Sequence, residues 1–147
     1  MSRRTSIVKA IAEKLKVIDG TGPYKTNIFG NAYAKLKFWD EVSDFSSIYV
    51  VAGSESREYM PAAFAWGFLN VSLKVYTKGE EAQTQLEELL EDIESVLDGS
   101  LGVIVYDTIH NYETSEISIT SITTDEGLLA PYAVGEMNLL IRYQIMK

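Results

Sequence analysis

The chain has 147 residues, of which 46% are hydrophobic, 23% charged and 11% aromatic, a composition typical of globular rather than disordered or fibrous proteins. It contains no cysteine, which excludes disulfides, thiolate nucleophiles and cysteine-containing metal sites. The formal net charge of −8 argues against sequence-specific nucleic-acid binding, because phosphate neutralisation supplies much of that affinity. No stretch approaches the roughly 18 consecutive apolar residues that a membrane span needs.

The sign of the charge changes near Lys37. Residues 1–37 contain eight basic and two acidic side chains, whereas residues 38–147 contain five and nineteen. Two such opposite patches can meet between subunits, or both can be solvated faces of one monomer. The charge pattern alone leaves both interpretations open.

The first predicted element is a helix over about residues 5–18, because its apolar side chains recur with helical spacing and Gly20 follows its end. Two short strands, over 24–29 and 32–38, are predicted around Gly30-Asn31 as a hairpin-like pair. Residues 40–47 are polar and predicted to form a loop. A short apolar strand over 48–52 then leads into a polar connection over 53–61.

The hydrophobic period changes at Lys78-Gly79. A strand over 68–77 precedes this point, with one aliphatic and one mixed face. An acidic amphipathic helix follows it. Thr84 and Glu87 have the spacing of a capping box, with an earlier start that includes Ala82 as the alternative, and Gly99 is well placed to end the helix. The apolar stripe of this helix is Leu86, Leu89, Leu90, Ile93 and Leu97, and its acidic side is Glu87, Glu88, Glu91, Asp92 and Glu94.

Three strand-like runs complete the chain. We predict strands near residues 101–106, around Ile117 and Ile119, and over 136–146, with a turn at Asp125-Glu126-Gly127. Strands outnumber helices, so we expect an α+β fold: one mainly antiparallel sheet with two helices on one face, forming a single domain over 1–147. The other face of the sheet would be left for a partner or for water.

Chemistry-bearing motifs give no enzyme signature. His110 is the only histidine, so no histidine cluster can bind a metal, and no spacing marks a serine nucleophile beside His110 and Asp107. The paired carboxylates fall on a helix face and in a turn, where solvated charge is the ordinary explanation. We therefore predict no catalytic, cofactor-binding or metal-binding residues, no cofactor and no enzymatic activity.

Several weak motifs in a fixed order cover nearly the whole chain. They are Gly22-Pro23-Tyr24 after the first helix, Phe38-Trp39-Asp40-Glu41-Val42, Tyr49-Val50-Val51-Ala52-Gly53-Ser54-Glu55, the strand and helix around Lys78-Gly79-Glu80, and Thr124-Asp125-Glu126-Gly127 before the last strand. Together they resemble the tail terminator, or tail completion, proteins of long-tailed bacteriophages. One departure is Phe45-Ser46-Ser47-Ile48, where that pattern leads us to expect a proline before the short strand.

The resemblance implies a structural virion protein of the tail and neck, assembled in the host cytoplasm. It would form a hexameric ring that caps the tail tube, ends tube polymerisation and presents a surface to the head connector or stopper protein. DNA would pass through the ring without sequence-specific binding, no membrane would be involved, and no cofactor is implied. The alternatives are another phage neck or head-completion protein, or a small ligand-binding or enzymatic α+β domain.

Candidate interface residues follow from the charge pattern, the polar loops and this resemblance. Basic and acidic side chains would pair between subunits or line the channel, and loops would contact the tube and the connector. The candidates are Arg3, Arg4, Lys35, Lys37, Asp40, Glu41, Asp44, Glu55, Arg57, Glu58, Tyr59, Glu87, Glu88, Glu91, Asp125 and Glu126.

Overall fold

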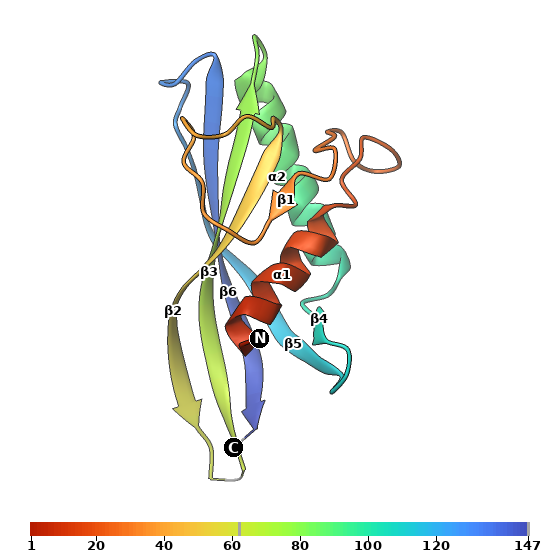
Figure 1. The fold of residues 1–147 in the computed structure, drawn as a ribbon, viewed down its shortest axis with the longest axis vertical. Helices are drawn as coiled ribbons and strands as arrows, with labels where there is room; N and C mark the ends of the chain where they lie inside the picture. Colours follow the sequence, from red (N-terminus) through yellow and green to blue (C-terminus); the bar gives the residue numbers. More distant parts are fainter. Residues whose placement is uncertain (62, 147) are drawn as a thin grey trace.

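The computed structural model describes residues 1–61 and 63–146 and confirms the predicted α+β fold. Within these residues one six-stranded, mostly antiparallel sheet has the strand order β1-β2-β3-β6-β5-β4, and both helices lie on one face of it (Figure 1). The elements are α1 (Arg3–Leu15), β1 (Ala32–Tyr33), β2 (Ser47–Tyr59), β3 (Phe64–Lys78), α2 (Ala82–Gly99), β4 (Val105–Asp107), β5 (Tyr112–Thr124) and β6 (Tyr132–Met146).

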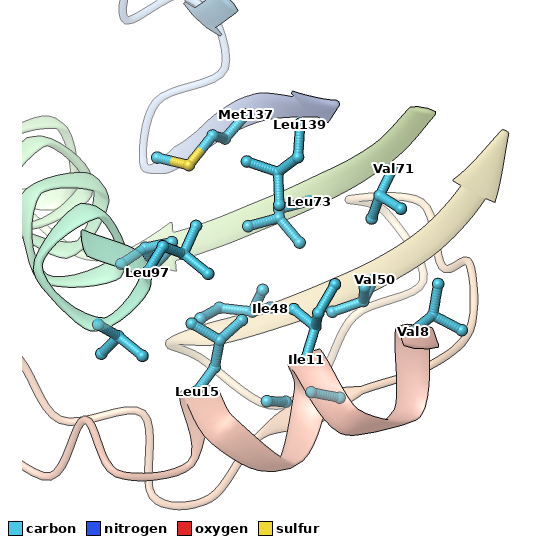
Figure 2. Packing of buried hydrophobic residues seen from close by; sticks show 14 of the residues in the cluster. Val8, Ile11, Leu15, Ile48, Val50, Val71, Leu73, Leu97, Met137 and Leu139 are labelled. Carbon is cyan, nitrogen blue, oxygen red and sulfur yellow. The ribbon is translucent and has the colours of Figure 1, made fainter. Parts of the chain in front are cut away.

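Helix α1 begins where the Ser2 hydroxyl accepts a hydrogen bond from the Thr5 backbone N–H at 3.1 Å, which satisfies one donor of the first turn. Its predicted apolar stripe is buried. Ile11 and Leu15 face Ile48 of β2 in the core (Figure 2). The sheet curls around α1, so that the helix contacts β2 and also β1 and β4 at the two opposite edges.

Helix α2 follows β3 at the predicted change of hydrophobic period. The chain turns between the two elements at Gly79, whose φ is 134°. Thr84 does not cap the helix, although its spacing to Glu87 had suggested a capping box. The alternative start at Ala82 is the one observed, and the N-cap residue Glu81 makes no side-chain capping bond. The apolar stripe is buried against β3 and β6. A Cβ at Gly135 would lie 3.0 Å from Leu86, so this glycine allows the helix to approach β6 closely.

The predicted hairpin over residues 24–38 was also wrong. Residues 24–29 form no strand, apart from one isolated bridge between Asp19 and Asn27. Only Ala32 and Tyr33 of the second run pair, and they pair in parallel with β2. Residues 34–38 form no strand: the chain bends at Ala34 and Lys35 and is irregular over 36–38.

The middle strands are longer than predicted. The predicted connection over 53–61 is mostly strand, because β2 continues to Tyr59 and pairs with β3 after a bulge between Ala52 and Glu55. Strand β6 begins at Tyr132 instead of residue 136, and β4 covers only Val105–Asp107. As a result β2, β3 and β6 extend below α1 as a three-stranded arm, formed by residues 53–59, 64–69 and 141–146 (Figure 1).

The sheet face away from the helices is only partly exposed. Residues 34–46 lie across one end of it, where Val42 packs with Tyr49 and Tyr76 in a small second cluster. The Tyr76 hydroxyl donates a hydrogen bond to the backbone carbonyl of Lys37 at 2.6 Å. We call the whole side of the sheet away from the helices the outer face. Only the part of the outer face that residues 34–46 leave uncovered is open to a partner or to water.

Candidate assembly interface

The two helices carry opposite charge. Helix α1 and its C-cap residue Lys16 contain five basic side chains and one acidic side chain. Helix α2 contains six acidic side chains and no basic one. Both helices lie on the same face of the sheet (Figure 1). The helical layer of the protein is therefore divided into a basic and an acidic part.

Two of the predicted basic residues lie at the start of α1. Arg3 is exposed, whereas Arg4 is half-buried. The Arg4 guanidinium donates a hydrogen bond to the carbonyl oxygen of Gly53 at the bulge of β2. This contact fixes the beginning of α1 to the upper end of the arm and leaves Arg3 as the more accessible charge.

The other predicted basic residues follow β1. Lys9, Lys16 and Lys35 line a groove of about 380 Å³ between α1 and β1. Lys16 is paired with Glu13 at 2.6 Å, and the Lys35 ammonium lies 5.2 Å from the ring centre of Tyr33, a cation–π distance. This groove concentrates positive charge next to the edge of the sheet.

The acidic residues of the following loop lie at the surface. Asp40, Glu41 and Asp44 are exposed. The Tyr33 hydroxyl donates to Asp44 at 3.3 Å, and partial burial together with this carboxylate raises the pKa of Tyr33. The carboxylate of Glu41 accepts a long hydrogen bond from the Phe38 N–H. Asp40 keeps its carboxylate accessible to a partner.

The candidates on the arm divide into internal and external residues. Glu55 accepts hydrogen bonds from the Tyr143 hydroxyl at 2.6 Å and from Arg57 Nε at 2.8 Å, and its side chain is only 5% exposed. Burial and the bond to Glu55 raise the pKa of Tyr143. Glu55 therefore holds the arm together, while Arg57, Glu58 and Tyr59 are exposed.

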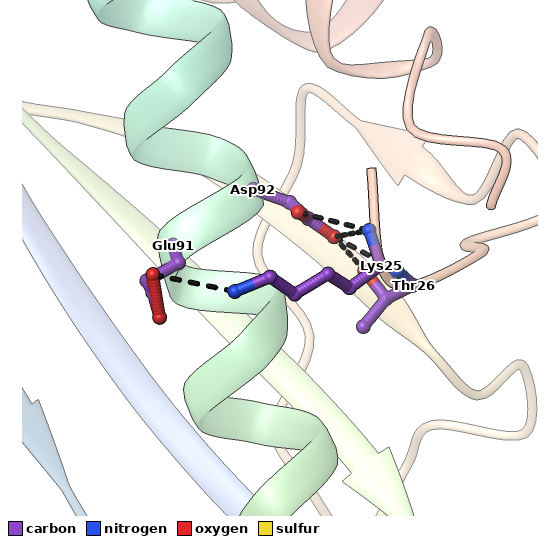
Figure 3. A network of polar contacts seen from close by, with 4 residues as sticks. All are labelled: Lys25, Thr26, Glu91 and Asp92. Carbon is purple, nitrogen blue, oxygen red and sulfur yellow. Dashed lines mark hydrogen bonds and ion pairs between the residues drawn. The ribbon is translucent and has the colours of Figure 1, made fainter. Parts of the chain in front are cut away.

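On α2, Glu87 and Glu91 are exposed and Glu88 is half-buried. Lys25 lies 3.5 Å from Glu91 (Figure 3). A surface ion pair of this kind contributes only about 0–1 kcal/mol. Most of the negative charge of the helix therefore faces solvent in the isolated subunit.

Asp92 was predicted on the acidic side of α2, and that placement was wrong. Its residue is 2% exposed, and its carboxylate accepts hydrogen bonds from the backbone N–H groups of Lys25 and Thr26 at 2.8–3.1 Å and from the Thr26 hydroxyl at 2.6 Å (Figure 3). Asp92 ties the segment after α1 to the middle of α2. Its position, three residues after Leu89 and four before Val96, already falls on the buried helix face.

The two residues of the predicted acidic turn have different surroundings. Asp125 accepts hydrogen bonds from the N–H groups of Leu129 and Val134, both at 3.0 Å, and so organises the turn before β6. Glu126 is exposed with a φ of 57°. Only Glu126 offers its carboxylate entirely to a partner.

An apolar cavity that sequence reasoning missed lies between this turn and the segment before Asp40. It measures about 340 Å³ and has the Lys74–Glu136 ion pair among its lining residues. Three large apolar residues at its rim remain well exposed: Leu36 (49%), Phe38 (59%) and Trp39 (36%). The alternation over 32–38 had instead suggested the second strand of a hairpin-like pair. The cavity brings Asp125 together with Leu36, Phe38 and Trp39, and none of the candidates on the arm lines it.

His110 lies in a turn that hydrogen bonds to Asp107 hold in place. Asp107 accepts hydrogen bonds from the Ile109 and His110 N–H groups, and Nδ1 of His110 lies 3.0 Å from the same carboxylate. The His110 ring stacks on Tyr112. Over residues 1–61 and 63–146 no group of three or more metal-ligating side chains gathers, and no helix has the length and hydropathy to cross a membrane.

The chain is similar to known proteins in sequence and in fold. Residues 1–147 match the family described as Bacteriophage Tail Tube Terminator Protein. The chain is 37% identical to the tail tube terminator protein p142 of Escherichia phage T5 over 98% of its own length and 95% of that protein. Its fold also matches a chain in the virion of the native gene transfer agent particle, with a TM-score of 0.60, 11% identity and coverage of 98% of this chain and 100% of that one. The chain therefore belongs to the family of bacteriophage tail tube terminator proteins.

Proposed function

We propose that this protein forms a hexameric ring on the end of the phage tail tube. In that position it ends polymerisation of the tube and presents the attachment surface for the head connector or stopper protein. The protein would be assembled in the host cytoplasm and remain in the tail and neck of the virion. Its contribution is structural, without cofactor or catalysis.

The opposite charge of α1 and α2 carries the ring proposal. A contact between two different surfaces propagates head to tail and closes into a ring when its rotation fits. The basic groove at Lys9 and Lys35 and the acidic face at Glu87 and Glu91 are two such surfaces. Attraction between the basic groove of one subunit and the acidic face of the next orients the two subunits and disfavours other contacts.

The apolar cavity supports a contact along the axis of the tail. Leu36, Phe38 and Trp39 expose apolar surface around a hollow, and exposed apolar patches of this kind mark protein contacts. We assign this surface to the last tube ring or to the connector. A subunit that covers the tube end in this way replaces the surface to which the next tube ring would have added.

The lumen must let DNA pass without holding it. Negative side chains facing the channel would repel phosphates, and Glu126 and the exposed carboxylates of α2 are the candidates for this role. The overall charge of −8 fits the same requirement.

The mass of the purified protein tests the ring. Light scattering at low and moderate salt, with negative-stain images of the same samples, should give particles of six times the 16.4 kDa chain mass with a central hole. If the protein stays monomeric both alone and with tail-tube subunits of the same phage, the proposal fails. The same mixture distinguishes another neck component, because only a terminator should bind tube ends.

A further inference from the structure

One edge of the sheet contains a stretch of β5 without a neighbouring strand. Strand β4 pairs with β5 only at Tyr112 and Glu113. The loop before β4 continues this cover, since a Cβ at Gly102 would lie 3.1 Å from the backbone nitrogen of Ile117. Beyond that point, the described residues give 118–124 no strand neighbour other than β6.

This stretch has neither a charged side chain nor a proline to prevent edge pairing, and a bulge between Ile119 and Ser121 is its one irregularity against β6. It has the sequence Ser-Ile-Thr-Ser-Ile-Thr-Thr, without a charge or a proline and rich in β-branched residues. Ile119 is half-buried and Ile122 is 44% exposed. A β-prone, uncharged free edge is an aggregation site unless a partner covers it. We therefore expect this edge to be covered in the assembled protein.

The opposite edge has a free stretch in the arm. Strand β1 pairs with β2 only at Ile48 and Tyr49, and Arg4 contacts the bulge at Gly53. Below the bulge, the described part of the chain gives 54–58 no strand neighbour other than β3. Each edge is thus covered over one half only, and the covered halves lie at opposite ends of the sheet (Figure 1).

We propose that residues 118–124 of one subunit pair antiparallel with residues 54–58 of the next, so that the sheet continues from subunit to subunit around the ring. This inference rests on the proposed ring. The β2–β3, β3–β6 and β6–β5 pairings are all antiparallel, so β2 and β5 run in opposite directions. Two subunits with the same orientation along the ring axis therefore present these edges to each other as antiparallel strands.

The offset between the two stretches suits ring closure. Glu55, Leu69, Ile141 and Ile117 form one row across the sheet. The free part of β2 runs from this row toward the end of the arm, and the free part of β5 runs the other way. When the free part of β5 pairs with the free part of β2, each subunit is displaced along the strand direction relative to its neighbour. A sheet that closes on itself requires a displacement of this kind between its strands.

Charge on the flanking residues is complementary in this arrangement. The acidic turn at Asp125 and Glu126 follows the free part of β5 directly. In the paired neighbour, the bulge that Arg4 contacts comes just before the free part of β2 in the sequence. Because the strands are antiparallel, this bulge and Arg3 next to Arg4 lie at the same end of the pairing as Asp125 and Glu126. At the other end Glu116 of one subunit would approach Arg57 of the next, although each is already paired within its own chain, Glu116 with Arg142 and Arg57 with Glu55. Attraction at the end of Asp125 and Glu126 favours this register over others.

Engineered disulfides test the pairing cleanly, because the chain has no cysteine. Ser56 lies opposite Phe68, and Ser121 lies opposite Asn138, on the outer face of the sheet. We would combine Ser56→Cys with Ser118→Cys, Ser121→Cys or Thr123→Cys, which sample three registers on that face. The matched control combines Ser56→Cys with Ser95→Cys, on the exposed side of α2.

Oxidation of assembled protein should give a ladder of covalent oligomers up to six chains from at least one of the three pairs, and none from the control. Rings of normal mass without any cross-link would overturn the pairing and leave the proposed ring intact. Absence of rings from the parent protein, alone and with tube subunits, would overturn the proposed ring and the pairing with it.

A second variant tests the edge without a disulfide. Ser121→Lys places a charge on an exposed position of the free edge and removes one exposed hydrogen bond, from Asn138 Nδ2 to the Ser121 hydroxyl. The monomer should therefore fold with unchanged circular dichroism and an unfolding midpoint that falls only slightly. Ring formation should fall at least tenfold. Unchanged assembly of this variant, with amide hydrogens of 118–124 that exchange as fast in the ring as in the monomer, would contradict the inference.

Discussion

The Asp92 carboxylate in the middle of α2 accepts hydrogen bonds from the backbone N–H of Thr26, at 2.8 Å, and from its hydroxyl, at 2.6 Å. The two residues are 66 positions apart in the sequence. Through this contact, the irregular segment after α1 is held against the second helix, which in turn fixes where the chain enters β1. The basic groove depends on that placement.

We predict that Asp92→Ala destabilises the protein by about 1–3 kcal/mol, because it leaves the partly buried N–H groups of Lys25 and Thr26 and the Thr26 hydroxyl without their acceptor. The free energy of unfolding in urea measures this loss. Glu94→Ala, two residues away and exposed, is the control and should change stability by less than about 0.5 kcal/mol. Equal effects of the two substitutions would show that the network contributes nothing special.

Gly67 provides the space for the Tyr143 ring in the arm. A Cβ at this position would lie 2.7 Å from a ring carbon of Tyr143, so Gly67→Ala should cost about 1–3 kcal/mol through overpacking. Gly99→Ala is the control, because an added Cβ there meets nothing within 4 Å, and it should be neutral or slightly stabilising. Thermal unfolding of both variants decides the point; a Gly67→Ala protein as stable as the parent contradicts the packing.

Stability should decrease in alkaline solution because buried tyrosines must remain protonated. Burial raises the pKa of Tyr76 to about 12, and burial and the bond to Glu55 raise the pKa of Tyr143, whereas an unfolded tyrosine titrates near about 10. The folded state therefore holds these protons more tightly, its stability is unaffected by them below about pH 10, and it declines above that pH. Urea unfolding between pH 8 and 11 (about the tyrosine range) should show this decline, and Tyr76→Phe should make it shallower. A slope that Tyr76→Phe leaves unchanged would exclude this tyrosine as a source.

The rim of the apolar cavity should matter for partner binding and not for folding. Leu36→Ser with Phe38→Ser removes exposed apolar surface, so the unfolding midpoint should hardly change while binding to tube ends or connector weakens at least tenfold. Ile109→Ser is the control, since Ile109 is 90% exposed on the β4–β5 turn. Sedimentation with tail tubes and with the connector measures both. Binding that survives the double substitution would move the contact elsewhere.

Charge pairing between subunits predicts a graded response at Lys35 and Lys37. Replacing both with Glu should weaken ring assembly strongly, replacing both with Gln should weaken it less, and added salt should reduce the difference, because screening acts on exposed charges. Light scattering across a salt series measures the effect. If the variant with Lys35→Glu and Lys37→Glu forms rings as stable as those of the parent protein, charge pairing is excluded as the basis of the ring.

The sequence predicted most of the fold where local pattern and burial agree. The strand before Lys78 and the acidic helix after it were recognised because each has one buried face. The lower half of β2 was predicted as a connection because its sequence is polar. No helix covers either face of the arm there, so Glu55 and Arg57 occupy sheet positions that would be apolar elsewhere. The strand predicted over 24–29 failed because the N–H groups of Lys25 and Thr26 bind Asp92, a contact across the chain that no local pattern reveals.

The candidate interface was less accessible to sequence reasoning. Charged residues such as Glu126 and Glu91 were correctly expected at the surface, and their role in assembly stays a prediction. Glu55 has its carboxylate inside the arm, which only the reach of Tyr143 across Gly67 explains. The cavity at Phe38 was missed because alternating apolar residues normally indicate a buried strand face.

The most direct measurement is electron microscopy of tail tubes polymerised from tube subunits of the same phage with and without this protein. We predict tubes that stop growing and carry a six-fold ring of this protein at one end. Tubes with bare ends that lengthen equally in the presence of the protein would contradict the account.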